Sequence, residues 1–498
     1  MTPELNLSVV GPLVFVSVGA MLVLLGEVLL SRAKSFLGHP VTAHTVNSML
    51  AGTAIVTLAL ATYMAFAHAA GGSATPFSMG RNLFMLDRFS ALISALVCLA
   101  SLLSCALSIH YLDELRINHG EYYALVLFAT AGMLVMVSAV DLLPVFLGLE
   151  LMSIPIYVLA GFDRRKLRSN ESALKYFLIG SFASAILLYG MALLYGVAGS
   201  TSFAAIRAGF SLDNPIAVAG LGLLVVGFGF KISSVPFHQW TPDVYEGAPA
   251  AVTAFMSVTV KLAAFAALLR VLALSFEPLG DAFANLIWVL AALTMVVGNV
   301  MAVIQDNIKR LLAYSSIAHA GYLLIGFVPG TPEGYASVVF YLVCYLFMNL
   351  GAFAVIVALA NRGRDFENME SLAGLARTRP ALAALMTLFM ISLAGIPGTA
   401  GFMGKWQVFS AAVGSGHVTL AIIGVLMSVV SVYYYLRVPV LMYMREPGSE
   451  APRQEIGFAE IGVLGVCAVA VLYLGIVPNG WLDVLAWARD SVAGLVAS

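Results

Sequence analysis

The chain has 498 residues, of which 61% are hydrophobic and only 10% are charged. Soluble domains carry about 25% charged residues, so this composition excludes a soluble protein of this size. The formal net charge of -1 says nothing about nucleic acid, and the sequence has no basic tract that would suggest a nucleic-acid partner, so we expect none. The apolar residues come in long runs, and this pattern indicates an integral membrane protein.

The apolar runs divide the chain into helical segments. The first thirty residues lack a basic region and a small-residue cleavage site, so we expect a membrane helix there rather than a removed signal peptide. A helix needs about 20 apolar residues to cross the bilayer core. The sequence therefore predicts an all-α polytopic membrane protein with about fourteen transmembrane helices. They lie near 9–30, 42–68, 88–111, 121–139, 141–162, 172–198, 215–240, 247–275, 284–305, 309–328, 334–360, 380–412, 417–444 and 456–476.

The basic residues between these helices are unevenly distributed. All but Arg81, Arg88, Arg207 and Arg489 fall in the odd-numbered connections. The positive-inside rule then places the odd-numbered connections in the cytoplasm. We expect a bacterial inner (plasma) membrane protein with both termini on the periplasmic side.

Cysteine and cofactor signals are weak. Cys98, Cys105, Cys344 and Cys467 form no CxxC pair, so we interpret them as buried small apolar residues. The sequence also lacks a dinucleotide-binding GxGxxG, a Walker sequence and HExxH. We therefore expect no cofactor and no metal in this chain.

Several basic residues nevertheless fall inside the predicted helices. Lys175 and Arg437 lie near cytoplasmic ends and Arg270 near an outer end, so we expect these three side chains to reach the interface. Lys261 differs, because Glu246 and Glu277 bracket its helix at separations of 15 and 16 residues. More than about 20 Å of helix separates it from either end, which is beyond the reach of a lysine.

Three other charges share this central position. Glu150 follows Asp141 by nine residues, roughly 13 Å of helix, and so lies near the middle of the bilayer core. Lys231 precedes Pro236, and Lys405 follows Pro397 in a glycine-rich run. Interrupted membrane helices are tolerated where they line a cavity.

The two interrupted helices are the seventh and the twelfth, five apart. This offset is typical of inverted repeats with a transport site at the interruptions. We therefore divide the chain into a three-helix segment (1–120), a first repeat of helices 4–8 (121–275), a second repeat of helices 9–13 (284–444), and a last helix with a short tail (445–498).

The central charges need a functional or a structural reason. Each costs about 2.5–3.5 kcal/mol at mid-helix. One alternative is a Lys–Glu pair that only stabilises packing, but one glutamate cannot neutralise three lysines. The other is a hydrated chain of proton-exchanging groups, because desolvation lowers a lysine pKa by up to about 3–5 units and a carboxylate raises it again. The candidates are Glu150, Lys231, Lys261 and Lys405.

Three further residues are candidates for a relay. Histidine titrates near neutral pH, so His238 and His319 could pass protons, with hydrogen-bonded packing as the alternative for each. Lys175 is the third candidate, beside its interpretation as an interface residue.

Longer motifs carry a family resemblance. The run FKISSVPFHQWTPDVYEGAPAAVTAFMSVTVKLAAF resembles the seventh and eighth helices of the antiporter-like subunits of respiratory complex I, the NADH–quinone oxidoreductase. WTPDVYEGAP, ESALKYFLIGSFASA, IKRLLAYSSIAHAGY and GIPGTAGFMGKW are similar to the N-type (ND2-type) subunits rather than the L and M types. The similarity spans nearly the whole chain.

The resemblance implies fourteen helices with inverted repeats 4–8 and 9–13, and proton translocation driven by redox chemistry in other subunits. By motif match, Glu150 is the fifth-helix glutamate and Lys231 its partner, Lys261 the central lysine and Lys405 the terminal one. It implies other membrane-arm subunits as partners, with M and K as neighbours, besides lipids, protons and water. A subunit of a multisubunit cation/proton antiporter and a purely structural spacer remain alternatives.

Overall fold

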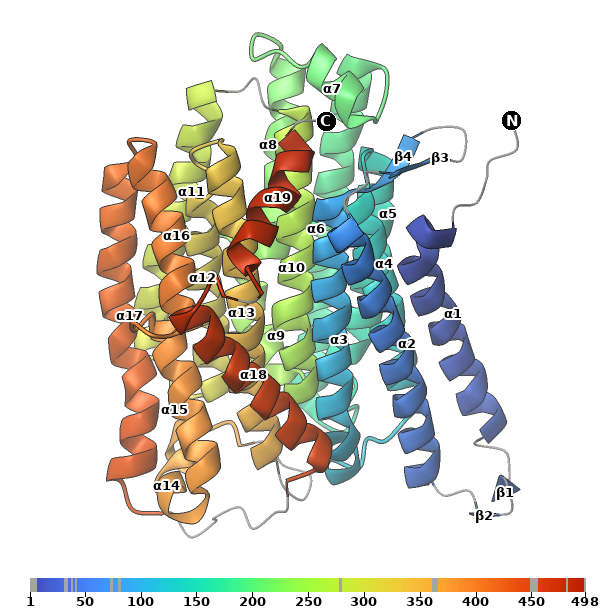
Figure 1. Ribbon diagram of the computed structural model, residues 1–498, viewed down its shortest axis with the longest axis vertical. Helices are drawn as coiled ribbons and strands as arrows, with labels where there is room; N and C mark the ends of the chain where they lie inside the picture. Colours follow the sequence, from blue (N-terminus) through green and yellow to red (C-terminus); the bar gives the residue numbers. More distant parts are fainter. Residues whose placement is uncertain are drawn as a thin grey trace.

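The computed structural model describes residues 7–30, 35–36, 39–40, 43–71, 75–78, 82–276, 280–360, 366–447, 456–480 and 482–496. Its long helices run side by side in one bundle (Figure 1). The helices are α1 Leu7–Leu30, α2 Ala43–Gly71, α3 Arg88–Glu114, α4 Glu121–Ser138, α5 Leu142–Ala160, α6 Leu167–Ala198, α7 Phe203–Gly209, α8 Pro215–Ile232, α9 Trp240–Gly247, α10 Ala250–Ser275, α11 Gly280–Val303, α12 Ile308–Ile325, α13 Pro332–Leu359, α14 Leu375–Thr378, α15 Pro380–Ala394, α16 Ala400–Gly414, α17 Val418–Met444, α18 Phe458–Ile476 and α19 Val484–Val496.

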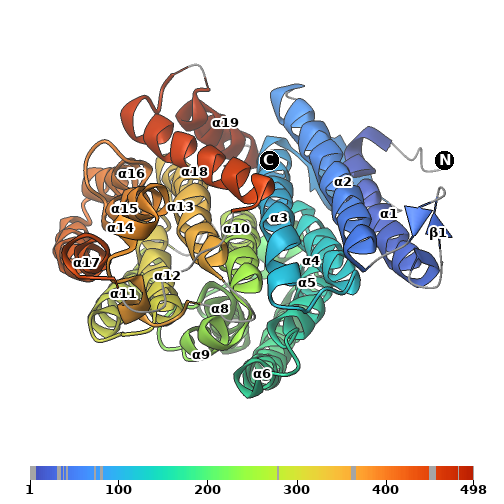
Figure 2. The same ribbon diagram turned by 90° about the horizontal axis from the view of Figure 1, so that it is seen from below.

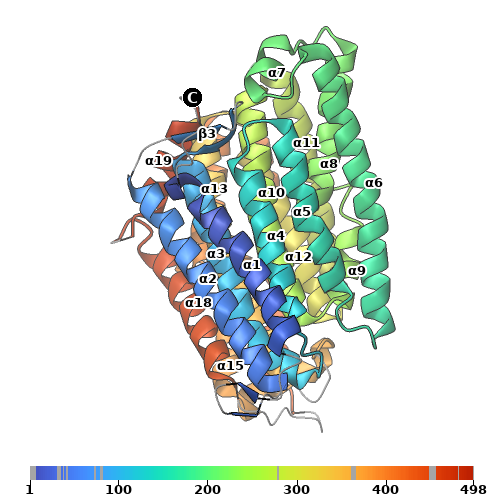
Figure 3. The same ribbon diagram turned by 90° about the vertical axis from the view of Figure 1, so that its right-hand side faces the viewer.

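Two short antiparallel strand pairs occur in the connections. They are β1 (Ser35–Phe36) with β2 (His39–Pro40), and β3 (Thr75–Ser78) with β4 (Asn82–Leu86). Figures 1 and 3 place β3, β4 and α7 at one end of the bundle and β1, β2 and α14 at the opposite end. Even-numbered and odd-numbered connections thus lie at opposite ends, as a chain that crosses a membrane repeatedly requires.

The predicted all-α membrane fold is confirmed. Among the described residues, 12 helices are long and apolar enough to cross a membrane. The two other predicted segments correspond to α12 and to the interrupted pair α15 and α16. The count of fourteen spans and the inverted repeats stay predictions, as does the orientation. Part of the charge count behind it, Arg32, Lys34, Arg81, Arg362, Arg364 and Arg453, lies outside the described residues.

Helix α10 occupies the centre of the bundle (Figure 2). Every residue of α10 except Leu274 is buried, although the helix is long enough to span a bilayer. Its many alanines let α3, α4 and α13 approach closely, which is how membrane helices associate when lipid is as apolar as the protein. Lys261 is therefore enclosed by other helices, away from lipid.

The seventh and twelfth predicted spans are interrupted at the expected places. Helix α8 ends where Ser233 adopts a left-handed conformation with φ 62, and Pro236 lies between α8 and α9. The Phe230 carbonyl at this helix end accepts from the indole of Trp240 at 2.9 Å and from the Ser233 backbone nitrogen at 3.1 Å, so it keeps partners at the interruption. Helix α15 ends at Gly395, with φ 85, and Pro397 follows before α16. A left-handed backbone conformation just after a helix C-terminus favours glycine at that position.

One expectation was wrong, and one helix was not predicted. Arg270 does not reach the interface: its side chain is 1% exposed and forms an ion pair with Asp87, the residue that caps the start of α3. The expectation was wrong because α3 packs against α10 and supplies a carboxylate inside the bundle. Helix α19 was not predicted; it packs against α13 and α3.

Candidate functional site

Lys231 lies in the last turn of α8 and is 2% exposed. Its ammonium group donates to the hydroxyl of Ser153 at 2.8 Å and to that of Tyr157 at 3.4 Å. The rings of Tyr157, Tyr176 and Phe230 also face it, with centroids 5.4, 5.6 and 5.5 Å away. Aromatic faces attract a cation, so the buried charge is stabilised without a direct ion pair.

Glu150 shares one face of α5 with the two hydroxyl groups that hold Lys231. Ser153 and Tyr157 follow it by three and seven residues, a spacing that places all three side chains on one side of a helix. The Glu150 carboxylate is close enough to interact electrostatically with Lys231. In the described part of the chain its Oε1 atom is buried without a hydrogen-bond partner. Glu150 and Lys231 are therefore neighbours, and the Ser153 hydroxyl that accepts from Lys231 lies on the same face of α5 as Glu150.

Lys261 lies in the middle of α10 and is 2% exposed. Its ammonium group donates to the backbone carbonyl of Ser316 on α12. The Tyr345 ring lies 5.4 Å from the ammonium nitrogen, and its hydroxyl donates to Ser316 Oγ at 2.9 Å. Polar groups of α12 and α13 therefore hold the central lysine.

His319 lies one turn beyond Ser316 on α12 and is buried. Its Nδ1 is 2.7 Å from the hydroxyl of Tyr341, and its Nε2 is 3.1 Å from the hydroxyl of Tyr435. The imidazole is close enough to interact electrostatically with both Lys261 and Lys405. Of the two histidine candidates, His319 is thus the one that lies between two of the buried lysines.

Lys405 lies on α16 beside the end of α15 and is 3% exposed. It donates to the carbonyls of Leu393 at 3.2 Å and Ala394 at 2.9 Å, and to Ser428 Oγ at 2.9 Å. These carbonyls are the last of α15, where the helix dipole is negative, so the interruption itself provides partners for a cation.

A series of contacting aromatic rings runs from Lys231 toward Lys261. Tyr176, which faces Lys231, stacks on Trp240 with centroids 4.4 Å apart. Trp240 in turn contacts Tyr245 edge-on at 6.3 Å, and the Tyr245 hydroxyl lies near Ser316. Rings also lie beside the other groups, because Lys405 faces the Tyr322 ring at 4.8 Å and Tyr322 contacts the imidazole of His319.

The remaining relay candidates lie apart from Lys231, Lys261 and Lys405, the buried lysines that we call the lysine row. His238 is half-buried in the connection between α8 and α9, where its Nδ1 has no partner among the described residues. Lys175 pairs with Glu171 at 2.7 Å and with Asp243 at 2.9 Å. Lys175 thus belongs to an ion-pair network between α6, α9 and α12 and not to the buried chain.

The ion-pair network should respond to acid. Burial raises the pKa of Asp243, but hydrogen bonds and charges from Lys175 and Arg310 outweigh it, so the pKa lies below the ordinary value. A carboxyl with a depressed pKa stabilises the fold above its ordinary pKa of about 3.9 and loses this effect as the pH falls further.

We expect Asp243→Asn to lower the thermal unfolding temperature slightly at pH 7, because partly exposed ion pairs contribute little. The difference from the unsubstituted protein should shrink in acid as the pH falls through the depressed pKa. A difference that stayed constant from neutral to strongly acidic pH would contradict the assignment of these partners.

Sequence reasoning missed the neutral partners of the lysines. Ser153 and Tyr157 could have been found from their spacing relative to Glu150. The Ser316 carbonyl, Ser428 and Tyr435 had no such signal, because their roles depend on contacts between helices distant in the sequence.

The fold defines a polytopic membrane protein, and the lysine row is buried inside its helix bundle. Residues 139–431 match the model of the family described as NADH:quinone oxidoreductase/Mrp antiporter, transmembrane region, and the chain belongs to this family. It is 46% identical over 480 residues to NADH-quinone oxidoreductase subunit N of Trichlorobacter lovleyi, covering 95% of each chain. It is also 46% identical to subunit N of Paramagnetospirillum magneticum, covering 85% of this chain and 88% of that one.

Two solved structures share the fold of this chain. A chain of respiratory complex I from Thermus thermophilus superposes with a TM-score of 0.77 at 35% identity, covering 95% of this chain and 99% of that one. A chain of the Mrp complex from Dietzia sp. gives 0.86 at 23% identity, covering 99% and 98%. The second likeness shows a shared fold only.

Proposed function

We propose that this chain is a membrane-arm subunit of NADH–quinone oxidoreductase that translocates protons through Glu150, Lys231, Lys261 and Lys405. The observation that carries the proposal is the environment of the three lysines. Each is nearly inaccessible, and each donates to neutral oxygens. For Lys261 and Lys405, whose hydrogen-bond partners are all neutral, the ammonium can lose its proton without leaving a buried carboxylate unpaired.

The proposed path follows the contacts. Movement of Glu150 toward or away from Lys231 changes the free energy of protonating the Lys231 amine, because the attraction between the two charges depends on their distance and on the local dielectric. Lys261 exchanges protons with Lys405 by way of His319 on α12. Each charge moved against 100 mV costs about 2.3 kcal/mol, so the driving force comes from redox chemistry in other subunits. The chain itself binds no redox cofactor in this proposal.

Two apolar flanks support assembly with other membrane-arm subunits. On α5, Leu147 and Ile154 are exposed beside Glu150. On α17, Val425 and Val429 are exposed on the helix that also carries Ser428. We propose that M-type and K-type subunits cover these flanks, that lipids cover the rest, and that both termini lie on the periplasmic side of a bacterial plasma membrane.

The test is assembly. When a tagged chain is purified from mild detergent, we expect a peripheral redox arm to co-purify, together with NADH-dependent quinone reduction. Recovery with only small antiporter subunits, and without NADH-oxidising activity, would instead identify a subunit of a cation/proton antiporter. The measurement is the subunit composition by mass spectrometry beside the NADH–quinone rate.

A further inference from the structure

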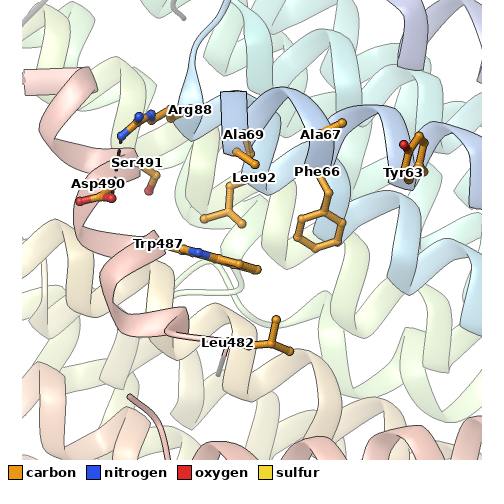
Figure 4. Close-up of a pocket in the computed structure, with 11 residues that line it drawn as sticks. Tyr63, Phe66, Ala67, Ala69, Arg88, Leu92, Leu482, Trp487, Asp490 and Ser491 are labelled. Carbon is orange, nitrogen blue, oxygen red and sulfur yellow. Dashed lines mark ion pairs between the residues drawn. The ribbon is translucent and has the colours of Figure 1, made fainter. Parts of the chain in front are cut away.

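A cavity of about 570 Å³ lies between α2, the start of α3 and α19, away from the lysine row (Figure 4). Its two ends differ in chemistry. Arg88, Asp490 and Ser491 lie together at one end, and the side chains of Phe66 and Leu482 lie away from them (Figure 4). Trp487 lies between and contacts the Phe66 ring, with centroids 6.0 Å apart. The cavity is thus amphipathic along its length.

The polar end carries one charge of each sign. Arg88 and Asp490 approach to only 3.8 Å, and both side chains are substantially exposed. In the described part of the chain, the Arg88 Nε atom is buried without a hydrogen-bond partner. Such a loose pair contributes little by itself and leaves the guanidinium free to bind an anion at close range.

The apolar end of the cavity lies beside exposed side chains of α2 that could contact lipid hydrocarbon. Tyr63 lines the cavity and is exposed, and Val56 and Leu60 are exposed on the same helix. Tyrosine and tryptophan are enriched where a membrane protein meets the polar headgroup layer. The occupant must therefore combine an apolar tail with a headgroup that carries both charges.

We propose that this cavity binds a phospholipid with a zwitterionic ethanolamine headgroup. The phosphate binds Arg88, the ammonium group binds Asp490, and an acyl chain lies against Phe66, Trp487 and Leu482. Charge complementarity favours this lipid over an anionic one, because an anionic headgroup would leave Asp490 facing a second negative charge. The site is separate from the proton path and does not depend on the proposed function.

The experiment uses the protein in whatever assembly it purifies with, reconstituted in vesicles of phosphatidylethanolamine and phosphatidylglycerol. One lipid at a time carries a photoreactive diazirine in an acyl chain, and labelled peptides are mapped by mass spectrometry. We expect the phosphatidylethanolamine probe to label residues 63–70 and 482–491 several-fold more than the exposed α17 face at 425–429. Equal labelling of these segments would show only general lipid contact and would overturn the proposal.

Variants test the headgroup contacts. Arg88→Gln should reduce labelling by the phosphatidylethanolamine probe several-fold, and Asp490→Asn should shift labelling toward the phosphatidylglycerol probe. Arg489→Gln is the matched control, because Arg489 neighbours Asp490 but does not line the cavity. If the unsubstituted protein is not labelled because another protein segment covers the cavity, a cross-linked peptide there would likewise overturn the proposal.

Discussion

Replacing Lys261 by methionine is expected to lower the rate of proton transfer through this chain by roughly a hundredfold, the usual contribution of a positioned proton-transfer group. Methionine is unbranched and apolar, so it fills the space between α10 and α12 but neither binds nor releases a proton. The measurement is the number of protons translocated per NADH oxidised by the assembled complex in proteoliposomes. We expect this ratio to fall while the complex remains intact.

Two further variants separate charge from proton exchange. Lys261→Arg keeps the positive charge, but arginine is not deprotonated in proteins, so the ratio should fall as it does for methionine. Lys166→Met is the control, because Lys166 lies at the surface near Asp163. An unchanged ratio in Lys261→Met would contradict the proton path and favour the structural spacer.

Replacing Arg270 by methionine is expected to destabilise the fold by roughly 3–5 kcal/mol, the typical cost of leaving a buried charge without its partner. Arg270 and Asp87 are nearly inaccessible, 1% and 4% exposed. Asp87 also accepts from the backbone nitrogen of Ser90 at 2.7 Å and so caps α3. The variant therefore weakens the contact between the start of α3 and the C-terminal part of α10.

The measurement is the thermal denaturation of the purified protein, with Asp87→Asn/Arg270→Met as the comparison. The double variant removes both charges, keeps a side chain that can cap α3, and should recover most of the stability. If the single and double variants were equally unstable, the loss would come from packing and not from the unpaired carboxylate. Neither substitution touches the lysine row, so proton translocation per assembled complex should not change.

The membrane fold could be predicted because the bilayer restricts the options. A backbone without water must satisfy its own hydrogen bonds, so long apolar runs become helices. The same restriction made the interruptions near Pro236 and Pro397 visible, because glycine and proline within an apolar run mark backbone that needs other partners. Helix α19 escaped prediction because it is short and lies after the last apolar run.

The buried charges were only partly predictable. The position of Lys261 followed from counting residues along one helix, since no helix end was within reach. Arg270 lies near a helix end, and counting along α10 could not show that Asp87, far away in the sequence, supplies a carboxylate there.

The sequence by itself determined that this protein lies in a membrane, that its helices break beside two lysines, and that four charges fall within its apolar helical runs. Only the tertiary structure decided what those charges contact. It placed the Ser153 hydroxyl beside Lys231, the Ser316 carbonyl beside Lys261 and the last carbonyls of α15 beside Lys405. Helix formation depends on local apolar length, whereas these contacts depend on which helices pack together, and apolar periodicity carries no information about that.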